Sequence, residues 1–527
     1  MLKNSEPGLT AGFFYWRLSA NFLTLGHQFM AKISIIGSGF SGLSAACFAA
    51  KEGHQVTVFE KNTGIGGRAR TYQEAGFTFD MGPSWYWMPD IFEHFFNQFG
   101  KSAADYYQLK KLDPGFQLIF PENETLEVPA DLDALYRVFE SIEPGSRKSL
   151  TKFLKEAEFK YNIGMKELVY KPAFSWMEYA NKDVILGMMK SNIFSSVSSY
   201  VKKYFKDPRL IALLEFPVLF LGAMANKIPA LYTMMNYSAL VQGTWYPEGG
   251  MHKIVEGMHE LAVSLGVEFR TETPVTRLRV AGGRVYALET AAGTELTDGV
   301  IASADYNHVE QQLLEKEYRN YSAEYWEKKT FAPSCLIYYL GIDREIPNLH
   351  HHNLFFDANL DQHAAEIYAD PQWPKDPLFY VCCPSKTDAS VAPEGMENIF
   401  ILIPIATGLT DTEEIRESYF KGIIERIEGR AGVSILPHII YKKSYCLDNF
   451  VDDYNAFGGN AYGLANTLMQ TAVLKPSLKN HQISNLFYTG QLTVPGPGVP
   501  PALISGQVAA EELLKSMAKN SRYEAAV

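Results

Sequence analysis

The chain has 527 residues, a length that predicts more than one domain. Its hydrophobic fraction of 47% and aromatic fraction of 13% allow a large core and an apolar cavity, whereas a formal net charge of −11 argues against nucleic acid as a partner. The five cysteines show neither zinc-site nor disulfide-framework spacing, so we expect buried thiols in a reducing compartment: Cys47, Cys335, Cys382, Cys383 and Cys446.

Residues 1–30 are predicted to be an N-terminal extension that the fold does not need. The stretch "AGFFYWRLSANFLTL" is interrupted by Arg17 and Asn21 and follows no strong basic region, so it is a poor signal peptide. No stretch of the sequence is long and apolar enough for a transmembrane helix. We therefore expect a cytoplasmic protein.

A dinucleotide-binding unit is predicted over residues 32–61. An apolar, β-branched run typical of a buried parallel strand leads into Gly37, Gly39 and Gly42, which form G-x-G-x-x-G. In this turn the second glycine lets the backbone approach a pyrophosphate at a helix N-terminus. An Ala-rich helix and a second strand follow, and Glu60 ends that strand where adenosine ribose hydroxyls should lie. The predicted binding residues are Gly37, Ser38, Gly39, Phe40, Ser41, Gly42, Glu60 and Lys61.

A second glycine-rich loop lies in "KNTGIGGRARTYQEAGFTFDMGPSWYW". Gly66 and Gly67, with Arg68 directly after them, suit a long dinucleotide whose diphosphate spans two loops, which a simple nicotinamide enzyme does not need. A strand then ends in a turn at Gly82 and Pro83. The aromatic cluster that follows is either ordinary core or a wall facing the substrate: Trp85, Tyr86 and Trp87.

Residues 106–245 are predicted to form a largely helical region that contacts substrate and membrane, because apolar residues recur there at helical spacing. An apolar run over residues 210–225 is too short to span a bilayer. The run is either a buried helix pair lining a cavity or an interfacial patch on a membrane. We favour a mixture, with a tunnel mouth resting on lipid beside the basic residues Lys202, Lys203, Lys206 and Arg209.

Over residues 246–305 the chain is predicted to return to the nucleotide-binding domain, through a helix, a hairpin at Gly282-Gly283 and a buried strand. Residues 306–448 contain strand-like runs ("CLIYYLGI", "LFYVCCP", "IFILIPI") that suggest a second sheet in a substrate-binding domain. Residues 449–527 then complete the nucleotide-binding domain. The histidines of "LHHHN" (His350 to His352) have no paired carboxylate or second histidine cluster, so we interpret them as a solvated loop and expect no metal site.

Together these stretches resemble the carotenoid desaturases of the bacterial phytoene desaturase type, within the amine-oxidase-like flavoprotein superfamily. The matching motifs are "GSGFSGLSAA", "VFEKNTGIGGRA", "FTFDMGPSWYWMPDIFEHFFNQFGK", "YPEGGMHKIVEGM", "TPVTRL" and "YTGQLTVPGPGVPPALISGQ". The resemblance implies an α/β fold with a Rossmann-type FAD-binding domain (residues 31–105, 246–305 and 449–527), an interleaved mixed-sheet substrate domain and a helical insertion. In one departure, Gln491-Leu492-Thr493 follows the late glycine, where the family often has a small residue and then Thr.

The resemblance also implies a noncovalently bound FAD. To the cofactor-binding residues it adds Gly82, Pro83, Ser84, Val275, Gly490, Gln491, Gly498, Val499 and Pro500, and it implies that Trp85, Trp87, Tyr232 and Tyr246 face the substrate.

The activity that the resemblance implies is the introduction of C=C bonds into a C40 carotenoid precursor, from phytoene toward neurosporene or lycopene. The implied partners are this long apolar polyene, a membrane surface, and a quinone or O₂ as electron acceptor. No catalytic residue is assigned, because flavin N5 can accept a hydride while the polyene delocalises positive charge.

Four alternatives stay open: a hydroxy- or methoxyneurosporene desaturase, a carotenoid isomerase, an amine or protoporphyrinogen oxidase, and a non-catalytic prenyl-lipid carrier of the GDP-dissociation-inhibitor kind. Retention of both glycine loops, Glu60 and Arg68 argues against the carrier.

Overall fold

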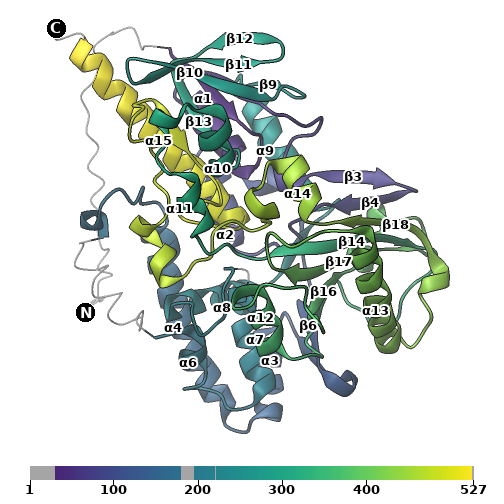
Figure 1. The fold of residues 1–527 in the computed structure, drawn as a ribbon. Coiled ribbons are helices and arrows are strands. Elements are labelled where there is room, and N and C mark those ends of the chain that lie inside the picture. The colour runs from purple at the N-terminus through teal and green to yellow at the C-terminus, as the bar shows by residue number, and fades with distance from the viewer. Residues whose placement is uncertain (1–29, 180–194, 220, 525–527) are drawn as a thin grey trace, which may run out of the picture. The chain divides into compact units, whose positions relative to one another are not determined.

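The computed structural model describes residues 30–179, 195–219 and 221–524 (Figure 1). Residues 1–29 of the predicted extension lie outside the described residues. All elements named below belong to the unit that begins at Ala31.

The first sheet is parallel, and its five strands come from three distant parts of the chain in the order β19-β13-β1-β2-β9. Ile33, Ile35 and Ile301 are buried in it, as expected for strands with both faces covered. The predicted Rossmann-type sheet is thus confirmed. Its strands are β1 (Lys32–Ile36), β2 (Gln55–Phe59), β9 (Glu268–Arg270), β13 (Gly299–Ala302) and β19 (Leu486–Tyr488).

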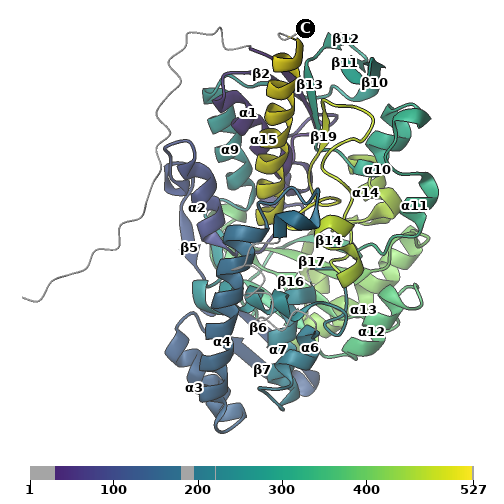
Figure 2. The same cartoon turned by 90° about the vertical axis from the view of Figure 1, so that its left-hand side faces the viewer.

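Helix α1 (Phe40–Lys51) and the C-terminal helix α15 (Val499–Glu524) lie side by side against this sheet (Figure 2). Their approach is close, since a Cβ on Gly506 of α15 would lie 2.2 Å from the Ser41 carbonyl oxygen of α1. Helix α9 (His252–Ser264) also packs on α1. Segments from both ends of the chain therefore cover the sheet together.

Gly42, in the first turn of α1, has no room for a side chain. A Cβ there would lie 2.1 Å from the Gly37 carbonyl oxygen and 3.1 Å from Ser303 Oγ. We expect Gly42→Ala to lower the free energy of unfolding by about 1–3 kcal/mol, measured by urea denaturation. The control is Gly422→Ala, at a helical glycine whose Cβ would meet no atom of the described chain within 4 Å. Equal losses in the two variants would contradict this account.

A three-stranded antiparallel sheet lies in the chain between β9 and β13, which are both strands of the parallel sheet. Its strands are β10 (Val275–Ala281), β11 (Arg284–Thr290) and β12 (Gly293–Leu296). Gly282 and Gly283 form the turn between β10 and β11 with φ values of +56° and +70°, which confirms the predicted hairpin.

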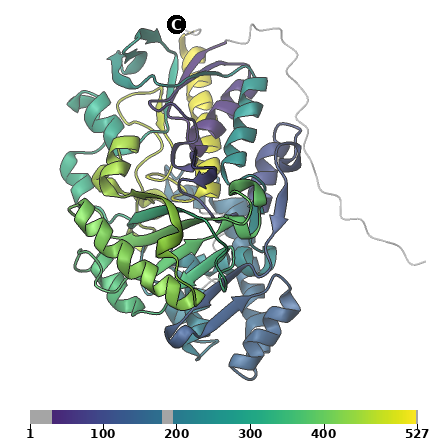
Figure 3. The same cartoon turned by 90° about the vertical axis from the view of Figure 1, so that its right-hand side faces the viewer.

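The second large sheet is mixed, with the order β18-β14-β17-β16-β15-β6-β7, and confirms the sheet predicted from the apolar runs of residues 306–448. Helix α13 (Glu413–Ala431) packs on it through Phe420, Ile423 and Ile427 (Figure 3). The strands are β6 (Phe116–Ile119), β7 (Thr125–Val128), β14 (Ser334–Ile342), β15 (His352–Phe355), β16 (Phe379–Cys382), β17 (Glu397–Ile405) and β18 (Ile439–Tyr445).

Two short strand pairs accompany the large sheets: β3 (Thr71–Glu74) with β4 (Phe77–Asp80), and β5 (Leu109–Lys111) with β8 (Trp245–Pro247). The region predicted as largely helical therefore begins with strands β5, β6 and β7, and is mainly helical only after them. Its helices are α3 (Leu132–Ile142), α4 (Ser146–Ile163), α6 (Val197–Val201), α7 (Pro208–Leu219) and α8 (Met235–Tyr237). The remaining helices are α2 (Pro89–Asn97), α10 (Tyr306–His308), α11 (Ala323–Glu327), α12 (Leu360–Tyr368) and α14 (Leu447–Tyr454).

The predicted membrane patch is corrected by helix α7. Leu210, Leu213 and Leu214 are fully buried, and Phe216, Leu219 and Leu221 line the large cavity described below, so this apolar run is not a lipid-facing surface. Arg209 forms ion pairs with Asp207 and Glu124. Lys202, Lys203 and Lys206 are exposed but have no exposed apolar face of α7 beside them. Within the described residues, no helix is long and apolar enough to cross a bilayer.

The interpretation of His350 to His352 as a solvated loop is wrong for two of the three histidines. His351 is 4% exposed, and His352 is fully buried at the start of strand β15. The His352 ring stacks on Trp85 with ring centroids 4.0 Å apart. That partner lies far away in the sequence, so the local pattern could not indicate the burial.

Candidate functional site

One cavity of ≈1230 Å³ runs from the carboxyl ends of β1 and β2 to the mixed sheet and the helical region. Almost all the predicted site residues line it. The cofactor set is Gly37, Ser38, Gly39, Phe40, Ser41, Glu60, Lys61, Gly66, Gly67, Arg68, Gly82, Pro83, Ser84, Val275, Gly490, Gln491, Gly498, Val499 and Pro500, and the substrate set is Trp85, Trp87 and Tyr232.

Two predicted residues do not line this cavity. Gly42 lies in the first turn of α1, where a side chain would clash with the Gly37 carbonyl oxygen, as described above. Tyr246 is 2% exposed, and its ring packs edge-on against His351 at 4.7 Å. Tyr246 lines a separate small cavity and does not line the large one.

The glycine-rich turn after β1 leaves its backbone open toward the large cavity. Gly37 has a φ of +97°, and its N–H donates to the Phe59 carbonyl oxygen (2.8 Å), which ties the turn to the end of β2. A Cβ on Gly39 would meet no atom of the described chain within 4 Å. The main chain at Gly39 can therefore approach a bound group such as a pyrophosphate.

Glu60 is buried at the end of β2 and holds the same turn. Its Oε2 accepts hydrogen bonds from Ser38 N (3.0 Å) and Ser38 Oγ (2.7 Å), and its Oε1 accepts one from Asn62 N (2.9 Å). A carboxylate has about four acceptor positions, so capacity remains for ribose hydroxyls. Burial and spacing both fit the predicted adenosine end of a dinucleotide.

Arg68 is a cationic residue that the described protein leaves partly unpartnered. Its Nη2 donates to the Asn460 carbonyl oxygen (3.0 Å), its guanidinium lies 5.0 Å from the Tyr454 ring centroid, and its buried Nε has no hydrogen-bond partner. Burial lowers the pKa of Arg68, although the Tyr454 and Asp305 groups act against that shift. An anionic group in the cavity would supply the missing partner.

The loop after β19 brings a third chain segment to the cavity. Ser505 Oγ accepts hydrogen bonds from Gly490 N (3.0 Å) and from Thr489 Oγ1 (2.9 Å). When the Gln491 amide is oriented so that its donors face acceptors, its side-chain oxygen accepts a hydrogen bond from Arg68 Nη2 (3.0 Å). The residue that departs from the family pattern is therefore compatible with the site, because its side chain contacts Arg68.

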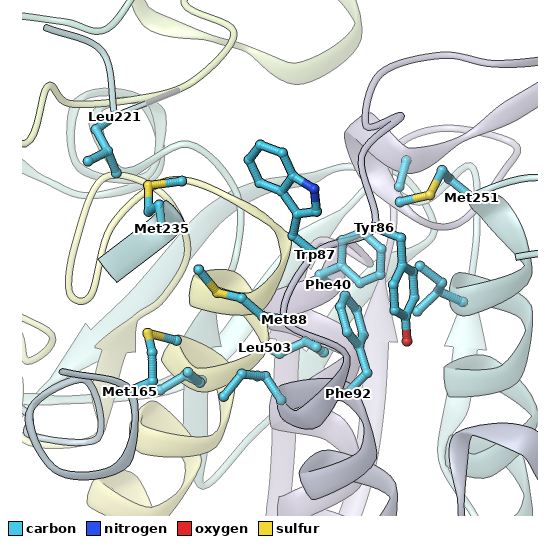
Figure 4. Packing of buried hydrophobic residues seen from close by; sticks show 14 of the residues in the cluster. Phe40, Tyr86, Trp87, Met88, Phe92, Met165, Leu221, Met235, Met251 and Leu503 are labelled. Atoms are coloured by element: carbon cyan, nitrogen blue, oxygen red, sulfur yellow. The ribbon is translucent and has the colours of Figure 1, made fainter. Parts of the chain in front are cut away.

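The other half of the cavity is apolar and comes mainly from the two regions predicted to contact substrate, although most of its individual residues were not predicted. Trp87, Met88, Met165, Leu221 and Met235 lie around it from separate segments (Figure 4). The mixed sheet and helix α12 add Leu354, Phe356, Ile367, Leu378, Phe379 and Leu402. Their alternating apolar pattern indicated strands and helices but not which face meets a ligand.

Two ionisable groups in the wall, His363 and Asp305, have protein partners. His363 Nε2 lies 2.8 Å from the Pro404 carbonyl oxygen, and its Nδ1 accepts from Leu378 N (3.0 Å). Asp305 accepts from His308 N (3.2 Å) and Phe457 N (3.4 Å), and burial raises its pKa. The site thus joins a dinucleotide cradle to an apolar chamber.

Comparisons with known proteins agree with this geometry. A family model described as flavin containing amine oxidoreductase matches residues 40–514. The chain is 39% identical over 490 residues to a carotenoid 3,4-desaturase of Haloarcula japonica (92% of this chain, 98% of that protein). It is 30% identical over 492 residues to a zeta-carotene-forming phytoene desaturase of Myxococcus xanthus (92% and 94%).

Among solved structures, an oxidoreductase from Methanosarcina mazei superposes with a TM-score of 0.59 at 16% identity, covering 91% of this chain and all of that one. That likeness shows the fold alone. The glycine turn, Glu60, Arg68 and the start of α15 fit the diphosphate and adenosine of FAD. The chain therefore belongs to the flavin-containing amine oxidoreductases, as a bacterial-type carotenoid desaturase that uses FAD.

Proposed function

We propose that this carotenoid desaturase acts on a C40 precursor, introducing C=C bonds into phytoene toward neurosporene or lycopene. The observation that carries the proposal is one continuous cavity that contains both the dinucleotide cradle and a long apolar wall. The phytoene desaturase of Myxococcus xanthus supports this choice of substrate, since the chain matches 94% of that protein.

Desaturation removes a hydride and a proton from adjacent carbons, and bound FAD supplies the hydride acceptor. The protein's own part is to bind and orient the chain and to exclude water. Each buried CH₂ of the substrate contributes about 0.8 kcal/mol, so Trp85, Phe216 and Phe356 can hold it without polar contacts. Positive charge spreads along the polyene, which lowers the demand for a strong base. A quinone or O₂ would then reoxidise the enzyme.

A second candidate is 3,4-desaturation of a more unsaturated carotenoid. The higher identity to the carotenoid 3,4-desaturase, 39% against 30%, favours it. Expression in phytoene-accumulating and in lycopene-accumulating bacteria, followed by pigment extraction, separates the two. Consumption of phytoene supports the first proposal, whereas conversion of lycopene with phytoene untouched supports the second.

We also propose that the mouth of the cavity rests on a membrane at a surface formed by Phe174, Trp176 and Met177, which we call the mouth surface. These side chains are 45%, 60% and 83% exposed, and Trp176 also lines the cavity together with Lys171. Exposed Trp and Met next to a lysine suit the interface between lipid headgroups and acyl chains. This surface replaces the apolar run of α7, which is buried.

Replacing Trp176 and Met177 together by Ser should lower the fraction of protein that sediments with anionic liposomes. Loss of their apolar burial should reduce the partition coefficient by about tenfold or more. The matched control replaces Leu296 and Leu436, which are 66% and 54% exposed and do not line the cavity. If both double variants sediment like the wild type, the mouth surface is not the membrane contact.

A further inference from the structure

A second, much smaller cavity of ≈20 Å³ lies beside the large one, since Ser84 lines both, and it has room for one water molecule or one ion. His351 and Cys382 line it together with the Asp80 carboxylate. His352 and Cys382 are directly opposite partners on the antiparallel strands β15 and β16. The topology thus brings two imidazoles and a thiol to one point of the sheet.

The three side chains have the geometry of a ligand set. One nitrogen of each imidazole and the Cys382 Sγ lie within 4.8 Å of one another. With zinc bonds of about 2.0–2.1 Å to nitrogen and about 2.3 Å to sulfur, ligand atoms at tetrahedral angles lie about 3.3–3.6 Å apart. Side-chain rotations that shorten the longest separation by about 1.3 Å would therefore bring all three atoms to one ion.

Both histidines have a buried nitrogen without a partner in the described protein. His351 Nδ1 lies 2.8 Å from Thr387 Oγ1, and His352 Nδ1 lies 2.6 Å from the Tyr380 hydroxyl. The two Nε2 atoms are buried and unpaired. A metal-bound histidine commonly uses its other nitrogen for such a hydrogen bond, which fixes the ring.

The surrounding charge also favours a cation. Asp80 accepts from Met251 N (2.7 Å) and His252 N (3.1 Å), and it lines the same small cavity. A cation bound there would offset the negative charge of the Asp80 carboxylate. Coordination by Cys382 requires its thiolate, so metal binding would release the thiol proton to solvent.

We propose that His351, His352 and Cys382 form a structural zinc site. Two imidazoles and a thiolate are ligands that Zn²⁺ prefers, and Asp80 or a water in the small cavity can provide the fourth. The ion would tie β15 to β16 and fix the His352 ring on which Trp85 stacks, and Trp85 lines the large cavity. The zinc would thus stiffen one wall of the substrate chamber.

The test is the zinc content of flavin-loaded protein, grown with added zinc, purified without a metal-affinity step and measured by mass spectrometry. We expect about one zinc ion per chain in the wild type and loss of that zinc in Cys382→Ala. The matched control is Cys383→Ala, an adjacent buried thiol that donates to Glu397 Oε2 (3.3 Å) and is not in the ligand set. It should keep its zinc.

Two further measurements keep the test decisive if Cys382→Ala folds poorly. Cobalt(II) replacing zinc in the wild type should show a thiolate-to-cobalt charge-transfer band, and a chelator should lower the wild-type melting temperature. Wild-type protein that binds flavin but holds no zinc and gives no such cobalt band would overturn the proposal, and the small cavity would then hold water.

Discussion

Gly39→Val is expected to yield a folded protein that no longer binds FAD. Gly39 has φ −67° and ψ 176°, an extended conformation that valine adopts without strain. A side chain there meets no atom of the described protein within 4 Å and points into the space of the cradle. It would occupy the place of the pyrophosphate, so FAD affinity should fall by more than about 100-fold, or about 2.7 kcal/mol.

The measurement is titration of the flavin-free protein with FAD, followed by flavin fluorescence, with circular dichroism as the check on folding. Gly39→Ala, with its smaller side chain, should lie between the wild type and Gly39→Val. A Gly39→Val variant that stays yellow and active would show that this turn is not the phosphate site.

Glu60→Ala should weaken FAD binding by about tenfold or more, because it removes the acceptor for the adenosine ribose hydroxyls. A charge-assisted hydrogen bond contributes about 1.5–3 kcal/mol. The loss also leaves Ser38 N, Ser38 Oγ and Asn62 N without their acceptor, which loosens the glycine turn. The dissociation constant from the same titration checks the effect.

Glu60→Gln provides the matched variant, since it keeps the shape and one acceptor oxygen but loses the charge. We expect its affinity to lie between those of the wild type and Glu60→Ala. Purification of Glu60→Ala with full flavin occupancy at low free FAD would count against the role of this carboxylate.

The cofactor half of the site was predictable because its signal is local. The turn from Gly37 to Gly42 and the acid at Glu60 lie within one strand–helix–strand unit, and the conformation of that unit depends on its own glycines. The late loop at Gly490 was added by the family resemblance of its Gly/Pro-rich motif. Most of these residues line one cavity in the structure.

The apolar half was not predictable in the same way, because its contacts are between distant segments. The burial of His352 depends on Trp85, and the chain between 106 and 131 forms strands because β6 pairs with β15. From its sequence, the apolar run that begins at Leu210 could equally have faced lipid or the protein interior. Packing of α7 against other elements buries it. An apolar pattern indicates that a face is covered but does not identify its partner.

The central claim, FAD-dependent desaturation of a carotenoid, is tested most directly by anaerobic mixing of flavin-loaded protein with phytoene in liposomes. We expect the visible flavin band to bleach as one double bond forms per flavin, with the product identified by chromatography. A flavin band that persists with phytoene and with lycopene, but bleaches with an amine such as putrescine, would contradict the account.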